Sequence, residues 1–238
     1  GEELVAADGV AAVVMGPRTA AGDTFEVTLV PGAGRAADDL LERIGEMPLP
    51  PYVTEALARR DRYQTVYARD GHSAAAPTAG LHFTPALLAA IEARGATVAR
   101  VELTVGLDTF QPVTAEDPLR HAMHTEAYRV PAATLEACRS CRAAGGRVLA
   151  VGTTAVRALE SAARGETEGR TRLFIHRGFE FAVVDRLLTN FHLPRTTLLM
   201  LVDAFVGPRW RALYAHAIAA GYRTLSFGDA MLLDRHVR

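Results

Sequence analysis

The sequence of 238 residues is 49% hydrophobic, enough for one substantial core or for one domain with a smaller companion. Its charges nearly cancel, to a formal net charge of -1, so no global field draws the chain to nucleic acid or to an acidic membrane. No apolar run reaches the roughly 20 residues of a membrane-spanning helix, and the first residues lack a signal pattern, so we expect a cytoplasmic protein.

The first part of the chain predicts short antiparallel strands. Apolar and polar side chains alternate over residues 2–30, interrupted by turns that contain glycine or proline. A strand-only piece of this size is too small to fold alone, so we expect it to belong to a small β module. An amphipathic helix is predicted over 36–44, and the proline-rich segment 47–53 that follows enforces extended backbone. We therefore predict a domain boundary between 1–46 and 47–238.

From residue 61 onward, predicted helices alternate with apolar, β-branched runs. This alternation is typical of an α/β fold, in which a parallel or mixed sheet has helices on its faces. In such a sheet, ligands bind beyond the carboxyl ends of the strands, where loops and helix N-termini converge. The predicted helices cover 85–94, 132–144, 153–163, 196–205 and 208–220, and the predicted strands cover 97–105, 147–151, 173–176 and 183–189.

The segment PTAGLHF, residues 77–83, has the most unusual local pattern. Pro, Thr, Ala and Gly in succession predict a tight turn through Thr78 and Gly80, which then delivers His82 beside Phe83. A histidine whose direction is fixed in this way can carry a proton near neutral pH. A lone histidine is more often a structural residue, but the turn favours a functional role here.

A second candidate is the segment VGTTAVRALES. A predicted strand ends just before Gly152, which permits close backbone approach, and Thr153 or Thr154 can cap the helix that follows. The free N–H groups of such a helix start stabilise a carboxylate or a phosphate. Arg157, one turn further on, can add a fork of donors, with Glu160 at i+3 as its predicted partner. The alternative is a well-capped helix with a surface ion pair.

Two further segments follow predicted strands and place polar or aromatic side chains at the same edge. Asp108 and Thr109 project there, and Phe110 is available to stack on a planar ring. Asn190 and His192 follow another strand. Both side chains can orient a substrate, or they can brace the loop.

The segment HAMHTE brings His121, His124 and Glu126 close together in the sequence. With His192 as an outside ligand these residues could form a metal site, but the spacing is not that of the HExxH motif. The only two cysteines form a CRSC motif in a predicted helix, without a second pair to complete a zinc site. No GxGxxG, Walker A or GxSxG motif is present, which argues against a standard dinucleotide enzyme, nucleotide triphosphatase or serine hydrolase.

Collinear segments along nearly the whole chain resemble those of one family. They read GEMPLPPYV, RYQTVYA, AAPTAGLHFT, TFQPV, HAMHTEAYRV, VLAVGTTAVRALES, LLTNFHLPRTTLLMLVDAF and FGDAMLL. In this order and spacing the chain resembles the S-adenosylmethionine:tRNA ribosyltransferase-isomerase family of queuosine biosynthesis. The resemblance implies an α/β catalytic domain, here 47–238, and an inserted β-barrel domain that is partly represented by 1–46.

The resemblance also implies a reaction. The ribosyl moiety of S-adenosylmethionine is transferred onto 7-aminomethyl-7-deazaguanine in tRNA and isomerised to give epoxyqueuosine, and adenine and methionine leave. The sulfonium acidifies the adjacent C5′ proton, so that a base can remove it and the resulting ylide drives adenine loss and ring rearrangement. S-adenosylmethionine is then a co-substrate, tRNA carrying the modified wobble base is the partner, and no metal is expected.

By this resemblance we assign expected roles to the residues of the matching segments. The expected catalytic residues are His82, Asp108 and His192. The residues expected to bind S-adenosylmethionine are Thr78, Gly80, Phe83, Thr109, Phe110, Gly152, Thr153, Thr154 and Arg157. The residues expected to bind the tRNA substrate are His121, His124, Glu126 and Asn190.

Two departures from the family pattern leave alternatives open. The usual VGAGTFQPV reads VGLDTFQPV, so Leu107 and Asp108 add bulk and a negative charge, which could pair with a sulfonium or a substrate amine or exclude the usual nucleobase. The N-terminal portion usual in the family, with its Asn-Thr-Arg segment, is not in this sequence. The alternatives are a related enzyme with a different acceptor, an inactive ligand-binding or RNA-binding relative, and a metal hydrolase.

Overall fold

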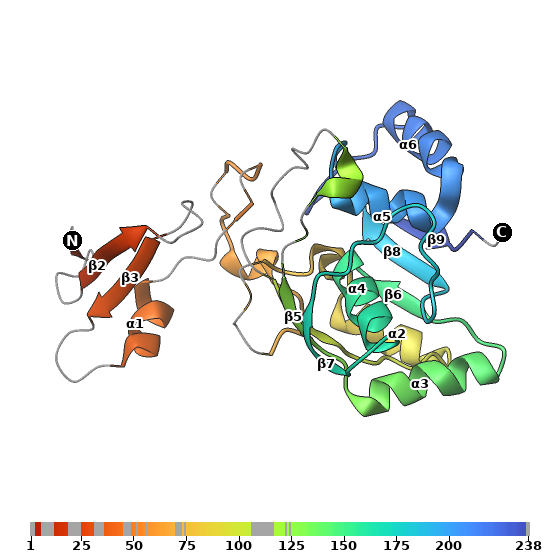
Figure 1. Ribbon diagram of the computed structural model, residues 1–238, viewed down its shortest axis with the longest axis horizontal. Coiled ribbons are helices and arrows are strands. Elements are labelled where there is room, and N and C mark those ends of the chain that lie inside the picture. The colour runs from red at the N-terminus through yellow and green to blue at the C-terminus, as the bar shows by residue number, and fades with distance from the viewer. Residues whose placement is uncertain are drawn as a thin grey trace. The chain divides into compact units, whose positions relative to one another are not determined.

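The chain forms two compact units, Gly1–Pro48 and Leu49–Arg238, seen in a computed structural model (Figure 1). None of the helices in the described ranges is long and apolar enough to cross a membrane. The structure describes residues 3–5, 12–18, 25–30, 36–44, 49–50, 52–55, 57–69, 73, 75–105, 117–121, 123 and 125–236.

The first unit contains an antiparallel sheet in which β2 is the central strand. The register between β2 and β3 shifts at Gly16 and Pro17, because proline has no N–H to give to the ladder. The predicted antiparallel strands are confirmed, while the β-barrel domain stays a prediction, since the described strands form an open sheet. The elements are β1 (Glu3–Val5), β2 (Ala12–Arg18), β3 (Phe25–Val30) and α1 (Ala37–Ile44).

The described residues of the second unit form two three-stranded sheets. One is antiparallel, in the order β4 (Glu102–Thr104), β5 (Glu126–Arg129) and β7 (Glu168–Thr171). The other has β8 (Arg186–Asn190) at its centre, parallel to β6 (Leu149–Val151) and antiparallel to β9 (Ala230–Asp234). The predicted mixed α/β class is therefore confirmed.

Helices surround these sheets, and their starts follow from local capping. The hydroxyl of Thr84 accepts a hydrogen bond from the N–H of Leu87, and that of Thr196 accepts one from Leu199. All five predicted helices of this unit are present, with ends that differ by one or two residues. They are α2 (Pro85–Ala93), α3 (Ala132–Ala143), α4 (Thr153–Ala162), α5 (Thr197–Val206) and α6 (Trp210–Ala219), with short 3₁₀ turns η1 (Arg60–Tyr63), η2 (Thr78–His82), η4 (Pro118–Arg120) and η5 (Gly207–Arg209).

Helix α4 lies at the centre of the core and contacts strands of both sheets. Its Val156 and Ala158 have no exposed surface, and neither do Leu187 of β8 and Phe205 of α5. Removing these apolar side chains from water is the main term that stabilises the unit. The same packing fixes the first turn of α4, which carries several of the predicted site residues.

Two predicted strands need correction. The strand predicted over 173–176 is wrong: the partner strand β5 begins at Glu126, opposite Thr171, so the ladder stops there. The strand predicted over 97–105 is confirmed only for 102–104. The sequence pattern does not predict β5, β7 or β9, because runs of four or five residues are too short for alternation to be distinctive.

A buried carboxylate on α4 holds the loop that leads into β8. Glu160 has no exposed surface, and its oxygens accept hydrogen bonds from the three backbone N–H groups of 182–184 at 2.8 to 3.0 Å. It also accepts one from the guanidinium of Arg164 at 2.6 Å. The predicted i+3 pairing of Glu160 with Arg157 is wrong, because the two side chains point to different parts of the core.

Substitution of this carboxylate should be strongly destabilising. Glu160→Gln places an amide N–H₂ against backbone donors in a buried position, so we expect the free energy of unfolding, measured by urea denaturation at pH 7, to fall by about 3 kcal/mol. Glu136→Gln, on the exposed face of α3, is the matched control and should leave the midpoint unchanged. Equal midpoints for the two variants would contradict this role.

Candidate active site

The conformation of the turn η2 is restricted, because side chains of residues outside the turn pack against its glycine, Gly80. The N–H of Gly80 donates to the carbonyl of Pro77 at 2.7 Å, and the N–H of Phe83 donates to that of Gly80 at 3.1 Å. A Cβ atom at Gly80 would lie 2.0 Å from the hydroxyl of Tyr67 and 2.8 Å from the methyl carbon of Thr65. Only glycine fits this position, so packing fixes the direction in which the turn points the next side chains.

The next polar side chain, His82, is held by a residue far away in the sequence. Its Nε2 lies 2.9 Å from Oδ1 of Asn190, at the carboxyl end of β8, and Nδ2 of Asn190 donates to the hydroxyl of Thr78 at 3.2 Å. Asn190 is only 3% exposed. Because an amide oxygen can only accept, this arrangement places the proton of His82 on Nε2 and leaves Nδ1 as the nitrogen that can take a proton.

The turn between β6 and α4 packs against the same segment. Gly152 adopts a φ of 89°, which favours glycine, and its N–H donates to the carbonyl of Leu188 in β8 at 2.8 Å. A Cβ atom there would lie 3.7 Å from that of Ala79. Gly152 supplies no side-chain cap, so the N–H groups at the start of α4, at Thr153 and Thr154, are donors of the kind that hold an anion.

Arg157 is engaged within the protein. Its Nη1 is paired with the fully buried carboxylate of Glu126, and its Nε donates to the carbonyl of Leu173 at 3.1 Å. Nη2 is buried and has no hydrogen-bond partner among the described residues. Burial lowers the pKa of Arg157, and the charge of Glu126 acts in the opposite direction. The pair ties α4 to β5.

His192 is held differently from His82. Its backbone N–H donates to the hydroxyl of Tyr214 at 2.9 Å, and its Nε2 lies 2.9 Å from the hydroxyl of the buried Thr189. Burial lowers the pKa of the His192 imidazole to about 4. The ring is therefore neutral near pH 7, which suits a residue that orients its neighbours better than one that accepts a proton.

The remaining predicted residues divide into three groups. Phe83 is only 9% exposed, so its ring belongs to the core and has little surface for stacking. His121 is half-buried, with its ring centroid 6.4 Å from that of Phe174. The predicted residues outside the described ranges are Asp108, Thr109, Phe110 and His124.

The structure therefore joins three predicted segments, at η2, at the start of α4 and at the end of β8. It also adds residues that sequence reasoning missed. Tyr67 and Thr65 pack on the η2 turn, and Tyr214 bonds to His192. The RYQTVYA segment is distinctive only through its family resemblance, and nothing local in it signals contact with a turn more than ten residues further along.

The described residues contain no group of three or more His, Cys, Asp or Glu side chains that could hold a metal ion. The metal site considered for His121, His124 and His192 includes a residue outside the described ranges. The two cysteines lie on α3 and are free thiols.

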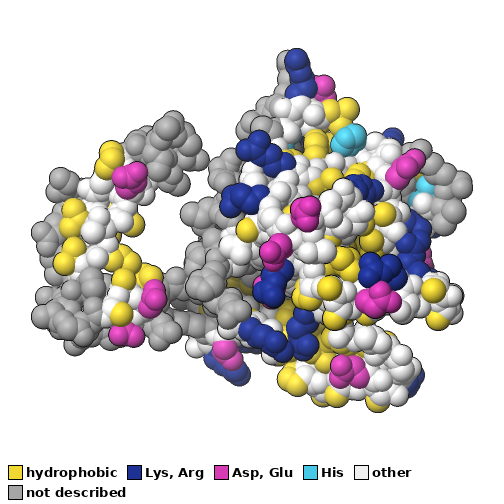
Figure 2. All heavy atoms as spheres, turned by 60° about the horizontal axis from the view of Figure 1, so that its bottom comes forward, with side chains coloured by type: hydrophobic (Ala, Val, Ile, Leu, Met, Phe, Trp, Pro, Cys, Tyr) yellow, Lys and Arg dark blue, Asp and Glu magenta, His cyan; other side chains and the backbone are white. Residues whose placement is uncertain are grey.

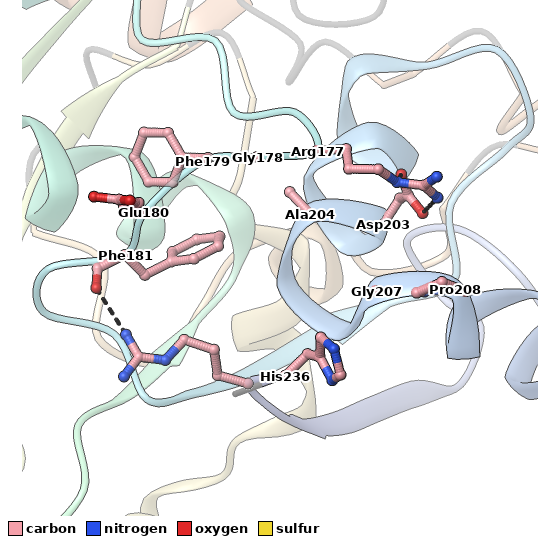
Figure 3. Close-up of a pocket in the computed structure, with 11 residues that line it drawn as sticks. Arg177, Gly178, Phe179, Glu180, Phe181, Asp203, Ala204, Gly207, Pro208 and His236 are labelled. Atoms are coloured by element: carbon pink, nitrogen blue, oxygen red, sulfur yellow. Dashed lines mark hydrogen bonds and ion pairs between the residues drawn. The ribbon is translucent and has the colours of Figure 1, made fainter. Parts of the chain in front are cut away.

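A cavity of about 400 Å³ lies between the loop 177–181, α5 and the end of β9 (Figure 3). None of the predicted site residues lines it. Arg177 donates to the carboxylate of Asp203 at 2.6 and 3.1 Å, and Arg235 donates to the carbonyl of Phe181 at 2.7 Å. Because these donors already bond within the protein, the cavity offers a ligand little specific recognition.

Charge on the larger unit is mixed on the face seen in Figure 2, where arginines and acidic side chains are interspersed. Several arginines are paired, for example Arg129 with Glu102 at 3.5 Å and Arg142 with Asp185 at 3.7 Å. This agrees with the net charge of -1.

Comparison with known proteins gives consistent matches. A family described as "Queuosine biosynthesis protein" matches residues 1–233. A protein of Rhodospirillum rubrum named S-adenosylmethionine:tRNA ribosyltransferase-isomerase is 52% identical, over 98% of this chain and 69% of that protein. A protein of the same name from Acaryochloris marina is 54% identical, over 82% of this chain and 54% of that protein.

Among solved structures, the S-adenosylmethionine tRNA ribosyltransferase of Thermotoga maritima matches with a TM-score of 0.54 and 34% identity. The match covers 97% of this chain and 64% of that one. The chain thus spans between 54% and 69% of the length of these three relatives.

The hydrogen bond between His82 and Asn190 predicts one tautomer of the imidazole. In ¹⁵N NMR spectra of the neutral ring, we expect the His82 signals of a protonated Nε2 and an unprotonated Nδ1. In Asn190→Ala, which removes the acceptor, the two tautomers should mix. A wild-type ring with its proton on Nδ1 would contradict the arrangement.

Burial of His192 should make stability depend on acid. Because the pKa is about 4 in the folded chain and 6.5 for an unperturbed histidine, the unfolded chain binds a proton in this window that the folded chain does not. The stability that the neutral ring of His192 contributes is complete above pH 6.5. As the pH falls towards 4 this stability is lost, and the free energy of unfolding falls by about 3 kcal/mol.

The measurement is urea denaturation at pH 7.5 and pH 4.5. His192→Gln should lose clearly less stability on acidification than the wild type, whereas His216→Gln, on the exposed surface of α6, should behave like the wild type. Identical acid sensitivity of all three proteins would argue against a buried, neutral His192.

Proposed function

Because the chain belongs to the queuosine biosynthesis protein family, we propose that it carries the catalytic part of an S-adenosylmethionine:tRNA ribosyltransferase-isomerase. The reaction transfers the ribosyl moiety of S-adenosylmethionine onto 7-aminomethyl-7-deazaguanine in tRNA. Isomerisation gives epoxyqueuosine, and adenine and methionine are released. S-adenosylmethionine acts as the co-substrate, and tRNA with the modified wobble base is the acceptor.

The observation that carries this proposal is the hydrogen-bonded set Thr78, Asn190 and His82. The first step needs a base that removes the C5′ proton made acidic by the neighbouring sulfonium. His82 can do this with Nδ1, because Asn190 keeps the proton on Nε2 and fixes the plane of the ring. The ylide formed in this step then expels adenine and rearranges.

The start of α4 is the proposed holder of an anionic group. Its N–H groups follow Gly152, which packs beside the turn that carries His82. The methionine carboxylate, or a phosphate of the tRNA, would be stabilised there by the positive end of the helix. The ion pair of Arg157 with Glu126 holds α4 in place below this turn. We propose that Nη2 of Arg157, which has no partner among the described residues, donates to the bound anion.

The other roles follow from position in the sequence and remain part of the proposal. Asp108 would pair with the sulfonium or with the substrate amine, and Thr109 and Phe110 would contact the co-substrate. His121 and His124 would face the tRNA, and Glu126, which is buried, would act on the tRNA site only through its ion pair with Arg157. His192, neutral because of its burial, would orient the loop that follows β8.

The test is adenine release from S-adenosylmethionine in the presence of modified tRNA, measured by chromatography. His82→Ala and His82→Asn should lower turnover about 10²-fold or more, while calorimetry shows that S-adenosylmethionine still binds. His216→Ala, on the exposed surface of α6, is the control and should turn over normally. Near-normal turnover of both His82 variants would rule out its proposed role.

A second candidate function retains the chemistry of S-adenosylmethionine but uses a different acceptor. Leu107 and Asp108 favour it, because they replace the small Ala-Gly pair of the family pattern with bulk and charge. Adenine release that does not depend on modified tRNA would support this candidate. Release only with modified tRNA would exclude it.

A further inference from the structure

Phe174, in the segment that follows β7, has two histidine rings close to its own ring. Its ring centroid is 6.4 Å from that of His121 and 5.2 Å from that of His176. All three side chains are half-buried, so neighbouring residues hold the rings in place while part of their surface faces solvent. Rings of this kind are stacking surfaces for unpaired nucleobases.

Two arginines precede Phe174 and His176 in the sequence. Thr171 is buried, whereas Arg170 and Arg172 on either side of it are exposed. Nη2 of Arg170 donates to the carbonyl of Thr125 at 3.2 Å, and Nε of Arg172 donates to the hydroxyl of Thr125 at 2.6 Å. These bonds fix both guanidinium groups and leave further N–H donors on each of them.

Neither arginine is neutralised within the described part of the chain. Arg129 of β5 is paired with carboxylates, and so is Arg177, which follows the second histidine. No ion pair joins Arg170 or Arg172 to a described carboxylate. An exposed, unpaired guanidinium is a fork of donors that suits a phosphate group.

We propose that the aromatic–arginine surface, formed by Arg170, Arg172, His121, Phe174 and His176, binds unpaired nucleotides of RNA. A base stacks on Phe174, and phosphates lie against the two arginines. This inference rests on the proposed function, in which the acceptor is a wobble base and its neighbours belong to the single-stranded anticodon loop.

Residues next to this surface in the sequence bond to Arg157 of the candidate active site. Thr125, which holds both arginines, directly precedes Glu126, the partner of Arg157. Leu173, which accepts a hydrogen bond from Arg157, directly precedes Phe174. Nucleotides that flank a reacting base would therefore meet this surface while an anionic group is held at the start of α4.

The first test is the affinity of the 238-residue chain for a fluorescein-labelled anticodon stem-loop, measured by fluorescence anisotropy. Phe174→Leu keeps an apolar side chain but loses the ring, so we expect binding to weaken roughly tenfold. Phe179→Leu is the matched control, since Phe179 is also half-buried and lines the cavity of Figure 3. A fully paired RNA duplex, which has no unpaired nucleotides, should bind both variants and the wild type alike.

The second test measures how RNA binding depends on salt concentration. It uses a substitution of an exposed arginine, which leaves the core unchanged. Arg172→Ala should reduce the slope of log K against log salt concentration by about 0.7, the value expected for one phosphate contact on a single strand. Arg139→Ala, an exposed arginine on α3 paired with Glu136, should leave the slope unchanged.

The outcomes separate this inference from the proposed function. Equal binding by Phe174→Leu and Phe179→Leu, an unchanged slope for Arg172→Ala, or no binding by the wild type would overturn the RNA surface, even with normal adenine release. Binding that depends on Phe174 and Arg172, without adenine release by the wild type, would support the surface and count against the proposed reaction.

Discussion

The geometry of the candidate site depends on the side chain of Asn190. It lies buried at the end of β8, and its amide is the only group in the described residues that bonds to both Thr78 and His82. An amide suits this place because it donates and accepts at once without carrying a charge that burial would penalise. The η2 turn is thereby attached to β8, the strand at the centre of its sheet.

Helix α4 adds the second attachment through charged groups. Glu160 fixes the loop before β8, and Arg157 with Glu126 joins the helix to the other sheet. A buried ion pair contributes little net stability, because desolvation of the charges offsets their attraction. The pair matters for position: α4 contacts strands of both sheets and so fixes where its own first turn, the proposed anion site, lies relative to them.

Patterns of neighbouring residues were enough to predict helix starts, a turn and a strand end. The hydroxyls of Thr84 and Thr196 mark helix starts, and the PTAGLHF turn and the strand end at Asn190 could both be singled out from neighbouring residues. The bond between His82 and Asn190 joins residues 108 positions apart, and no periodicity reports such a contact. Helical spacing suggested that Arg157 pairs with Glu160, but the partner comes from β5, 31 positions earlier.

The contact between Gly80 and Tyr67 links the site to a segment with little regular structure. Since the phenol oxygen occupies the space where a side chain would begin, the direction of His82 depends on the order of residues 57–69 as well as on the sheet. Local opening of such a segment costs less free energy than global unfolding. On warming, the chain would lose its aligned histidine while the sheet and α4 were still intact, so that inactivation would precede melting.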